Sequence, residues 1–460
     1  KRTGIQPFFK HPLRAVFNDS YEFMPHRHFA NDFLTFFKDK RGYDISLYLP
    51  VNMKPCYNNA YVAPFFADKP FDFSYSKEDW RIRYDYDLTI SELFIKHFIK
   101  ASDNWLNKQS LLHRTQAYGV KMDIIAASGA ADIPEAEQLA GDNSEGFVKL
   151  VTSGAHLYNK PIISQESFVF RDMAETTTPQ KIRVLADKSF AAGVNQIFYH
   201  GSPYKYQTGE YGKEGWMPFS TPFDPGTFSS TINESSPFWK DIKIVNQYIA
   251  RSQYVLQSGK HSADVLIYFP FNDFIPDQIS VNPKEILVQG RFKGVEPDIP
   301  TGVPSAAHIV ELPKIWYQKI WPLINALEAR GITWDFVNDE SLQSAKYDNG
   351  KINIRTNLYS YLIVANAPYI QLSTAEKIAQ LALNKANLLF YGETPTEQPS
   401  YFNYKENDRK TALLMKQALL QSSSQQLKDE YAFIDYVSNL QVNLKFTHSI
   451  DFVRTTERKM

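Results

Sequence analysis

A repeating order of short apolar segments and helix-like segments is the feature of this sequence that most limits its fold. In the first half of the chain, a short apolar run is followed by a polar loop and then by a segment with helical periodicity. Residues 13–17 predict a strand, and residues 29–41 predict a helix with several phenylalanines on one face. Strands that alternate with helices form βα units, which place the strands in a parallel sheet.

About five such units fit residues 1–260, which we interpret as a (β/α)8-type barrel domain with its C-terminal strands visible. A complete barrel has eight strands, so we expect the first three upstream of Lys1 or supplied by something else. Further strands are predicted at 112–118, just before 132–135, at 161–164 and at 195–199, with helices at 88–108, 144–158, 178–192 and 237–257.

A second series of αβ units occupies residues 261–435 and predicts a flavodoxin-like (glutamine-amidotransferase-like) doubly wound domain. Its strand ends lack a glycine-rich phosphate loop, which disfavours a nucleotide-binding role. Residues 436–460 change to an alternating pattern, which predicts the start of a β-rich region. Strands are expected at 263–270, 333–337, 359–365 and 387–391, and helices at 314–330 and 373–385.

The charge and the cysteine content exclude several classes of function. The 50 basic and 50 acidic side chains cancel, which disfavours nucleic acid and anionic membrane as partners. Cys56 is the single cysteine, so neither a disulfide framework nor a cysteine-based zinc site is expected. No segment approaches the roughly 20 apolar residues that span a bilayer. The first residues have no apolar signal core and no initiator Met, so we expect a mature or trimmed product.

Acidic residues gather where the predicted barrel strands end, in residues 19–22, 132–137 and 165–168. Glycoside hydrolysis needs one protonated carboxyl to assist the leaving group and a second, ionised one to activate water or attack carbon. Strand ends of a barrel converge on one ligand although they are far apart in sequence, and the environment can split their pKa values. The alternative interpretation is that each acid caps a helix or solvates a loop.

Two further residues follow the last predicted barrel strand. His200 is placed to bind a sugar hydroxyl or to orient a carboxylate, although a structural histidine is an equal alternative. Trp216 lies in a tyrosine-rich loop that would wall a sugar pocket or form a hydrophobic cluster of its own. The side-chain oxygens around Asp19 are ligands that a hard cation prefers. The sequence has neither EF-hand spacing nor an H-E-x-x-H pair, so any such site would be assembled from distant residues. The absence of a G-x-S-x-G sequence disfavours an α/β-hydrolase.

Together these motifs resemble glycoside hydrolase family 106, the α-L-rhamnosidases. The resemblance extends over residues 13–390 and depends on the combination, because each motif alone is not specific. The motifs include Asn18-Asp19-Ser20-Tyr21-Glu22, Gln116-Ala117-Tyr118-Gly119, Asp132-Ile133-Pro134-Glu135-Ala136-Glu137, Gln165-Glu166-Ser167-Phe168 and His200-Gly201.

The resemblance implies an inverting hydrolase that removes terminal α-L-rhamnose from a complex polysaccharide such as pectin. It implies Glu22 as the general acid and Glu137 as the general base, with Glu135 competing for the base role. Glu166 would be a third pocket carboxylate, which contacts the sugar or, with Asp19, holds a calcium ion. A periplasmic or secreted location fits such a substrate.

The residue patterns and the resemblance together predict a set of substrate-binding residues. These are Asp19, Gln116, Tyr118, Glu135, Glu166, His200 and Trp216. Gln116 stands where the family pattern leads us to expect an acid, and this departure bears on the preferred substrate.

Two alternatives remain open. A different barrel glycosidase, β-galactosidase-like and retaining, would use Glu166 as the nucleophile; its carboxyl groups would lie near 5 Å apart, against roughly 6.5–9.5 Å for inversion. A non-catalytic carbohydrate-binding protein on a decayed hydrolase fold would fit the incomplete barrel and Gln116. The paired acids argue against it, because binding alone does not require two carboxylates facing one bond.

Overall fold

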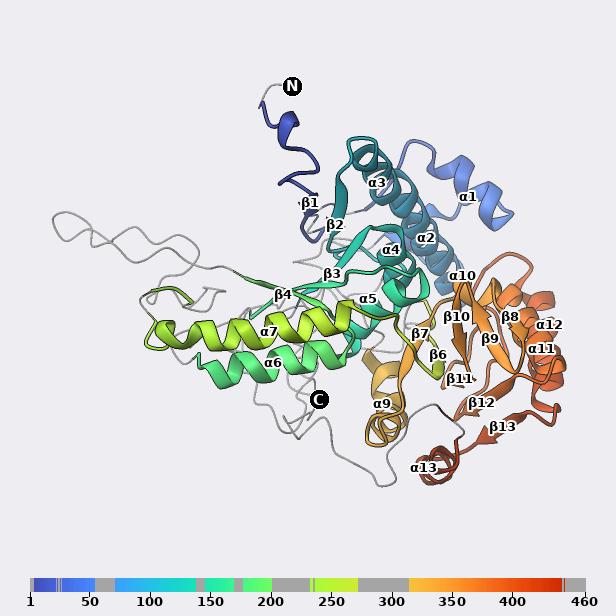
Figure 1. Ribbon diagram of the computed structural model, residues 1–460. Helices are drawn as coiled ribbons and strands as arrows, with labels where there is room; N and C mark the ends of the chain where they lie inside the picture. Colours follow the sequence, from blue (N-terminus) through green and yellow to red (C-terminus); the bar gives the residue numbers. More distant parts are fainter. Residues whose placement is uncertain are drawn as a thin grey trace.

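The chain forms two parallel sheets joined through helices (Figure 1). The structure is a computed structural model. It describes residues 4–21, 23, 25, 27–53, 71–137, 145–168, 177–200, 232–234, 236–271, 314–440 and 442.

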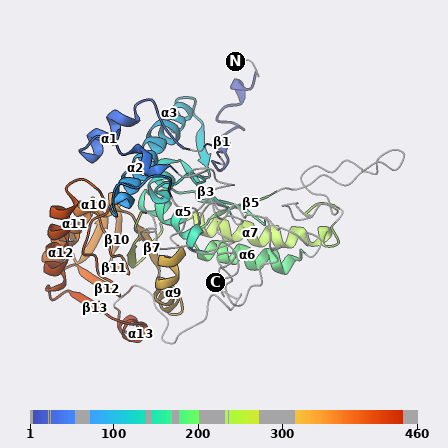
Figure 2. The same cartoon turned by 180° about the vertical axis from the view of Figure 1, so that it is seen from behind.

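The first sheet has five parallel strands whose spatial order follows the sequence, β1-β2-β3-β4-β5. The strands are β1 Ala15–Asn18, β2 Leu112–Thr115, β3 Ile133–Glu137, β4 Ser164–Ser167 and β5 Gln196–Tyr199. The helices around them are α1 Phe33–Arg41, α2 Asp79–Phe94, α3 Lys100–Asn107, α4 Ile124–Ala130, α5 Glu145–Leu157, α6 Pro179–Ala191 and α7 Ile242–Gln257. Figures 1 and 2 show α6 and α7 side by side against the β5 end of this sheet.

This sheet is curved as in a half barrel. The guanidinium of Arg114 on β2 lies 3.5 Å from the ring centroid of Phe198 on β5, three strands away. Neighbouring strands are about 4.8 Å apart, so side chains standing perpendicular to a flat sheet would not meet over that distance. Five sequential parallel strands with helices outside are the arrangement of an α/β barrel.

Local sequence signals explain where several helices begin and how closely they pack. Thr178 caps α6 by accepting the Lys181 N–H at 3.1 Å, directly before a proline at the first helical position. Asp123 caps α4 in the same way, accepting the Ala126 N–H at 2.9 Å. A Cβ on Gly154 of α5 would lie 2.5 Å from the Ile125 carbonyl oxygen, so glycine permits the close packing of α4 on α5.

The second sheet has five parallel strands in the order β13-β12-β11-β6-β7, so the chain reverses direction across the sheet between β6 and β11. Its strands are β6 Val265–Tyr268, β7 Trp334–Val337, β11 Tyr361–Ala365, β12 Asn387–Tyr391 and β13 Ser424–Leu427. Its helices are α9 Lys314–Glu328, α10 Asp339–Gln343, α11 Leu372–Leu383, α12 Tyr404–Leu419 and α13 Glu430–Ser438. In Figure 1, α11 and α12 lie together on the side away from α9 and α13.

A small antiparallel sheet, which the sequence did not indicate, is inserted between β7 and β11. Its strands are β8 Lys346–Asp348, β9 Lys351–Ile354 and β10 Asn357–Tyr359. The expected β-rich region at 436–460 is corrected in part, because α13 continues to Ser438, and residues 443–460 lie outside those described. In the described residues no helix has the length and apolarity to cross a membrane.

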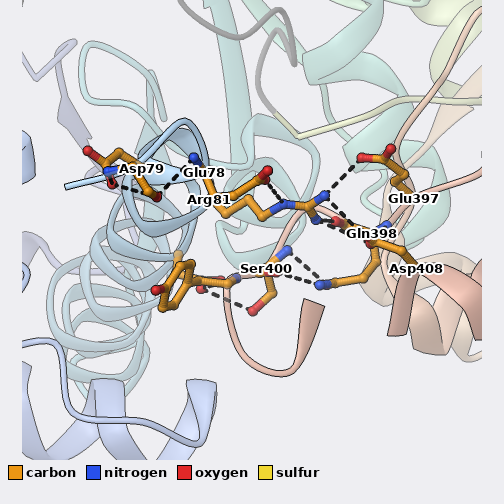
Figure 3. A network of polar contacts seen from close by, with 10 residues as sticks. Glu78, Asp79, Arg81, Glu397, Gln398, Ser400 and Asp408 are labelled. Atoms are coloured by element: carbon orange, nitrogen blue, oxygen red, sulfur yellow. Dashed lines mark hydrogen bonds and ion pairs between the residues drawn. The ribbon is translucent and has the colours of Figure 1, made fainter. Parts of the chain in front are cut away.

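Polar contacts of a buried arginine connect α2, beside the first sheet, to the segment 397–408 of the second sheet's part of the chain. Arg81 of α2 is 2% exposed and contacts Glu78, Glu397, Asp408 and the Gln398 carbonyl, as Figure 3 shows. The distance from Arg81 Nη2 is 2.8 Å to Glu397 and 3.0 Å to Asp408. One hydrophobic core continues from the first sheet's helices into the second sheet.

Candidate active site

The carboxyl ends of the first sheet carry a row of polar side chains on its concave face. Strand β3 is paired with β4 so that Glu135 is opposite Ser164 and Glu137 is opposite Glu166. Side chains alternate across a strand, so Glu135 and Glu137 share one face. The contact between Glu135 and Arg114 of β2 shows that this face is the concave one.

The strand positions correct two predictions. We expected a strand to end before residue 132 and another at residue 164, with the acids in the loops that follow. Instead Glu135 and Glu137 lie within β3, and Glu166 lies within β4. The strands were misplaced because their inward faces are polar, whereas the prediction followed apolar runs. Asp132 lies at the opposite end of β3, where it accepts the His113 N–H at 3.0 Å.

Glu135 is fully buried and both of its oxygens are occupied as acceptors. Arg114 donates to both oxygens, with Nη2 to Oε1 at 3.0 Å. Oε2 also accepts from the Ser164 hydroxyl at 2.6 Å, and Oε1 accepts from the Gln116 amide at 3.3 Å. A carboxylate with these four donors has no position left to take a proton from water. Glu135 is therefore poorly placed to act as a base.

Glu166 has a different environment, although it is on the neighbouring strand. Its Oε2 accepts from Gln116 Nε2 at 2.5 Å, and its Oε1 lies 3.5 Å from His200 Nε2. Burial raises the pKa of Glu166 to about 7; the Gln116 hydrogen bond opposes this, while the negative charges of Asp19 and Glu135 add to it. Glu166 thus exchanges its proton near neutral pH, as acid–base catalysis requires.

Glu137 ends β3 and is partly exposed. The Tyr118 hydroxyl donates to its Oε2 at 3.2 Å. Burial, followed by the charges of Glu137, Glu166 and Glu135, raises the pKa of Tyr118 well above its ordinary value. Tyr118 therefore stays protonated and donates a hydrogen bond to Glu137 at the strand end.

A glycine fixes the segment that precedes Glu22 against the loop after β2. Gly119 has φ +101°, and a Cβ there would lie 2.6 Å from the Tyr21 carbonyl oxygen. The Tyr21 N–H donates to the Tyr118 carbonyl at 2.8 Å, and the Tyr21 hydroxyl lies 2.9 Å from Thr115 Oγ1. Only glycine accommodates this approach. Tyr21 is thus held against the Tyr118 loop; Glu22 lies outside the described residues.

The structure brings together six of the residues predicted from sequence. They are Gln116, Tyr118, Glu135, Glu137, Glu166 and His200. Asp19 is exposed directly after β1 and acts on Glu166 through its charge. Trp216, like Glu22, lies outside the described residues.

Sequence reasoning missed Arg114. Its guanidinium lies between two rings, 4.2 Å from the Phe17 centroid and 3.5 Å from the Phe198 centroid. Arg114 is in β2 and Gln116 directly follows that strand, two positions later, so both side chains are expected on the same face; this pattern could have found Arg114.

The described residues contain one group of three side chains with metal-ligand chemistry and spacing, His156, His261 and Asp335. Lys149 Nζ lies 3.4 Å from Asp335 Oδ1, and the two imidazole rings stack at 3.3 Å. The Lys149 ammonium competes with a cation for Asp335, and the lone pairs of the two parallel imidazole rings do not converge on one point. These three residues therefore form a hydrogen-bonded cluster rather than a metal centre.

The strand ends of the first sheet have the oxygen chemistry that suits calcium. Gln116 Oε1 is buried and has no hydrogen-bond partner among the described residues. The carboxylates of Glu166 and Asp19 are near enough to each other for their charges to interact. Amide and carboxylate oxygens are the ligands that calcium takes, so the residues fit such an ion.

A half-barrel sheet with carboxylates at adjacent strand ends defines the class of the barrel glycoside hydrolases. The family model described as α-L-rhamnosidase, glycoside hydrolase family 106, matches residues 1–285. The chain belongs to this family, as its sequence motifs indicated.

Individual relatives agree with this assignment at the level of the fold. A rhamnosidase structure from Novosphingobium sp. PP1Y superposes with TM-score 0.61 over 93% of this chain and 36% of that one, at 18% identity. A β-galactosidase structure from Bacillus circulans sp. alkalophilus gives TM-score 0.50 over 88% of this chain and 54% of that one, at 12% identity.

One curated relative bears another name. A putative β-glucuronidase from Formosa agariphila is 23% identical over 384 residues, which are 81% of this chain. The chain spans 26% of the length of that protein. The names of the relatives therefore agree on glycoside chemistry and differ in the sugar.

Proposed function

We propose that this chain carries the catalytic centre of an inverting hydrolase that removes terminal α-L-rhamnose, or a related sugar, from a polysaccharide such as pectin. The observation that supports it best is the hydrogen bond from the Tyr118 hydroxyl to Glu137 at the carboxyl end of β3, where a general base is expected. Family membership adds the expectation of rhamnose. A polysaccharide substrate favours a periplasmic or secreted location.

In the proposed mechanism Glu22 gives its proton to the glycosidic oxygen as the C–O bond breaks. Glu137 takes a proton from a water that attacks the anomeric carbon from the opposite face. The electron pair of that bond stays with the leaving alcohol, and the sugar is released with inverted configuration. Tyr118 supports this role, because its hydroxyl donates to Glu137 Oε2 and so orients the carboxylate at the strand end.

Calcium belongs to the proposal through the family resemblance. Glu166 and Asp19 would hold the ion. Bound there, it would orient sugar hydroxyls and offset the negative charge that gathers at these strand ends. We also propose that residues 261–435 form a flavodoxin-like domain, since their strand order corresponds to 2-1-3-4-5 along the chain.

A retaining mechanism with Glu166 as the nucleophile is the second candidate. The favouring observation is the position of Glu166 at the centre of the polar row, between Gln116 and His200. Its pKa of about 7 counts against it, because a nucleophilic carboxylate must be ionised at the working pH.

The test is release of free sugar from a panel of aryl glycosides, with the α-L-rhamnoside included, before and after treatment with a calcium chelator. Rhamnose release that is lost in Glu22→Gln and Glu137→Gln would support the proposal. Glu406→Gln is the control, because Glu406 is an exposed carboxylate on α12, in the second sheet's part of the chain, where it pairs with Lys410.

The configuration of the first product separates the two mechanisms. Proton NMR during the first minutes should detect the anomer opposite to that of the substrate. Product of the same configuration would establish retention and leave Glu166 as the nucleophile. No release from any glycoside by the folded protein, with sugar binding intact, would make this a binding protein.

A further inference from the structure

Arg114 is rigidly held at the floor of the candidate active site. Its guanidinium carbon lies 4.2 Å from the Phe17 ring centroid and 3.5 Å from the Phe198 ring centroid, on opposite flanks of the half barrel. Its side chain is 16% exposed. Planar stacking on aromatic rings together with a bidentate carboxylate contact restricts the guanidinium to one orientation.

Glu135 transmits that orientation. Arg114 donates to both of its oxygens, and Ser164 donates to Oε2 at 2.6 Å. The remaining acceptor position, on Oε1, is directed at Gln116 Nε2, 3.3 Å away. Donors occupy the other three acceptor positions of Glu135. The Oε1 position that faces Gln116 can therefore only accept a hydrogen bond from Gln116, so it selects the amide nitrogen.

The amide of Gln116 consequently has one favourable orientation. Its nitrogen lies between two carboxylate oxygens, 3.3 Å from Glu135 and 2.5 Å from Glu166. The reversed amide would place its oxygen against Glu135, acceptor facing acceptor. The observed orientation leaves Oε1 buried, with no partner in the described part of the chain. A buried acceptor without a donor is costly unless a ligand supplies one.

We propose that Arg114 is a positioning residue, which acts through Glu135 to hold the Gln116 amide with its nitrogen toward Glu166 and its oxygen free to accept a sugar hydroxyl. This deepens the proposed function and rests on it for the identity of the ligand. In this scheme Arg114 acts through Glu135 and does not contact the substrate.

The first test is a double-mutant cycle read out by L-rhamnose binding in calorimetry. Arg114→Met and Gln116→Leu should each weaken binding about tenfold, as expected for one lost hydrogen bond. The double variant should be no weaker than the weaker single variant, because both changes remove the same oriented oxygen. Multiplied effects, near a hundredfold, would overturn the proposal by showing that the two residues act independently.

The second test needs neither hydrolysis nor rhamnose binding. In protein labelled with 15N in its glutamine side chains, the Gln116 signal is the one that disappears in Gln116→Leu. Its NH2 protons should exchange slowly with solvent in the parent protein and faster in Arg114→Met. An unchanged Gln116 signal in folded Arg114→Met would refute the positioning role, whereas failure of rhamnose binding with a changed signal would refute only the proposed substrate.

Two further variants guard the interpretation. Arg114→Lys keeps a cation between the rings but loses the bidentate contact to Glu135, so the Gln116 NH2 protons should exchange at an intermediate rate. If Arg114→Met fails to fold, Arg114→Lys replaces it in the test. Arg355→Met is the matched control, since its guanidinium also lies 3.5 Å from an aromatic centroid, that of Tyr158, far from Gln116. Arg355→Met should leave the Gln116 signal and rhamnose binding unchanged.

Discussion

Glu166 in the first sheet is partly buried and Asp335 in the second sheet is fully buried; both carboxylates have histidine neighbours, yet their pKa values move in opposite directions. Burial raises the pKa of Glu166 to about 7, and its charged neighbours Asp19 and Glu135 add to the rise. Burial alone would also raise the pKa of Asp335, but the charges of His261, His156 and Lys149 together hold it well below its ordinary value.

The two contact sets explain the difference. Asp335 Oδ1 lies 2.8 Å from His156, and Oδ2 lies 2.9 Å from His261, with Lys149 and the Tyr359 hydroxyl also within reach. Glu166 has an amide, a histidine 3.5 Å away and other carboxylates. A buried acid held by a lysine ammonium and two imidazoles is fixed in charge and holds structure together, whereas a partly buried acid near other carboxylates is poised to exchange a proton.

The largest expected difference between the two carboxylates is in activity. Glu166→Gln should lower kcat/KM on the responsive glycoside by about 10²–10⁴-fold, the range for loss of an acid–base or pocket carboxylate. Asp335→Asn, assayed well below its unfolding temperature, should stay within a few-fold of the parent. Equal losses in both variants would show that the division into a reactive and a structural carboxylate is wrong.

The next difference is in stability. Asp335→Asn leaves Lys149 and both histidines without their carboxylate, so the free energy of unfolding should fall by about 3–5 kcal/mol. Urea unfolding followed by circular dichroism measures this. Glu406→Gln, at an exposed pair with Lys410, is the control and should change by less than about 0.5 kcal/mol. A loss below about 1 kcal/mol for Asp335→Asn would contradict the assignment.

Acid should destabilise the His156 cluster. Burial lowers the pKa of His156 to about 4 from 6.5. Between these values the unfolded chain binds a proton that the folded chain does not, so stability falls as pH falls from 6.5 to 4. The expected loss is on the order of 3 kcal/mol. Urea titrations at three pH values would measure it, and His156→Gln should show a shallower dependence; an identical slope would exclude His156 as the cause.

The smallest effect is a gain in stability. The folded pKa of Glu166, about 7, exceeds its ordinary value of 4.5, so ionising Glu166 above pH 7 destabilises the folded chain. Glu166→Gln removes that charge and should raise the free energy of unfolding at pH 8 by on the order of 1–3 kcal/mol. At pH 4 the gain should vanish. The unfolding measurement is made in the presence of a chelator, because a bound cation would offset the charge of Glu166. If Glu166→Gln were less stable than the parent at pH 8, the assigned effect of the Glu166 charge would be wrong.

Much of the architecture could be predicted from sequence. Residues 178–192 were expected to be a helix and form α6 Pro179–Ala191, because a threonine cap and a proline mark its start. The alternation of strands and helices likewise gave both parallel sheets. The short β8–β9–β10 sheet was not found, since its three- and four-residue strands carry too little pattern.

The sequence predicted which residues form the candidate site but not the role of each residue. The competition between Glu135 and Glu137 could not be resolved from spacing, because both share one face of β3. What distinguishes them is Arg114, which occupies Glu135 from another strand. Such partners are set by sheet register and curvature, and neither can be read from a single sequence.

The Arg81 network has a consequence for the order in which this protein can be made. Arg81 emerges from the ribosome long before its partner Asp408, 327 positions later in the chain. At about 5–20 residues per second, α2 waits on the order of a minute or less for that partner to be synthesised. Until then the Arg81 guanidinium has to be hydrated, so the surface around it stays exposed to solvent. Any attempt to express the first sheet by itself therefore exposes a surface shaped for a segment that is not yet there.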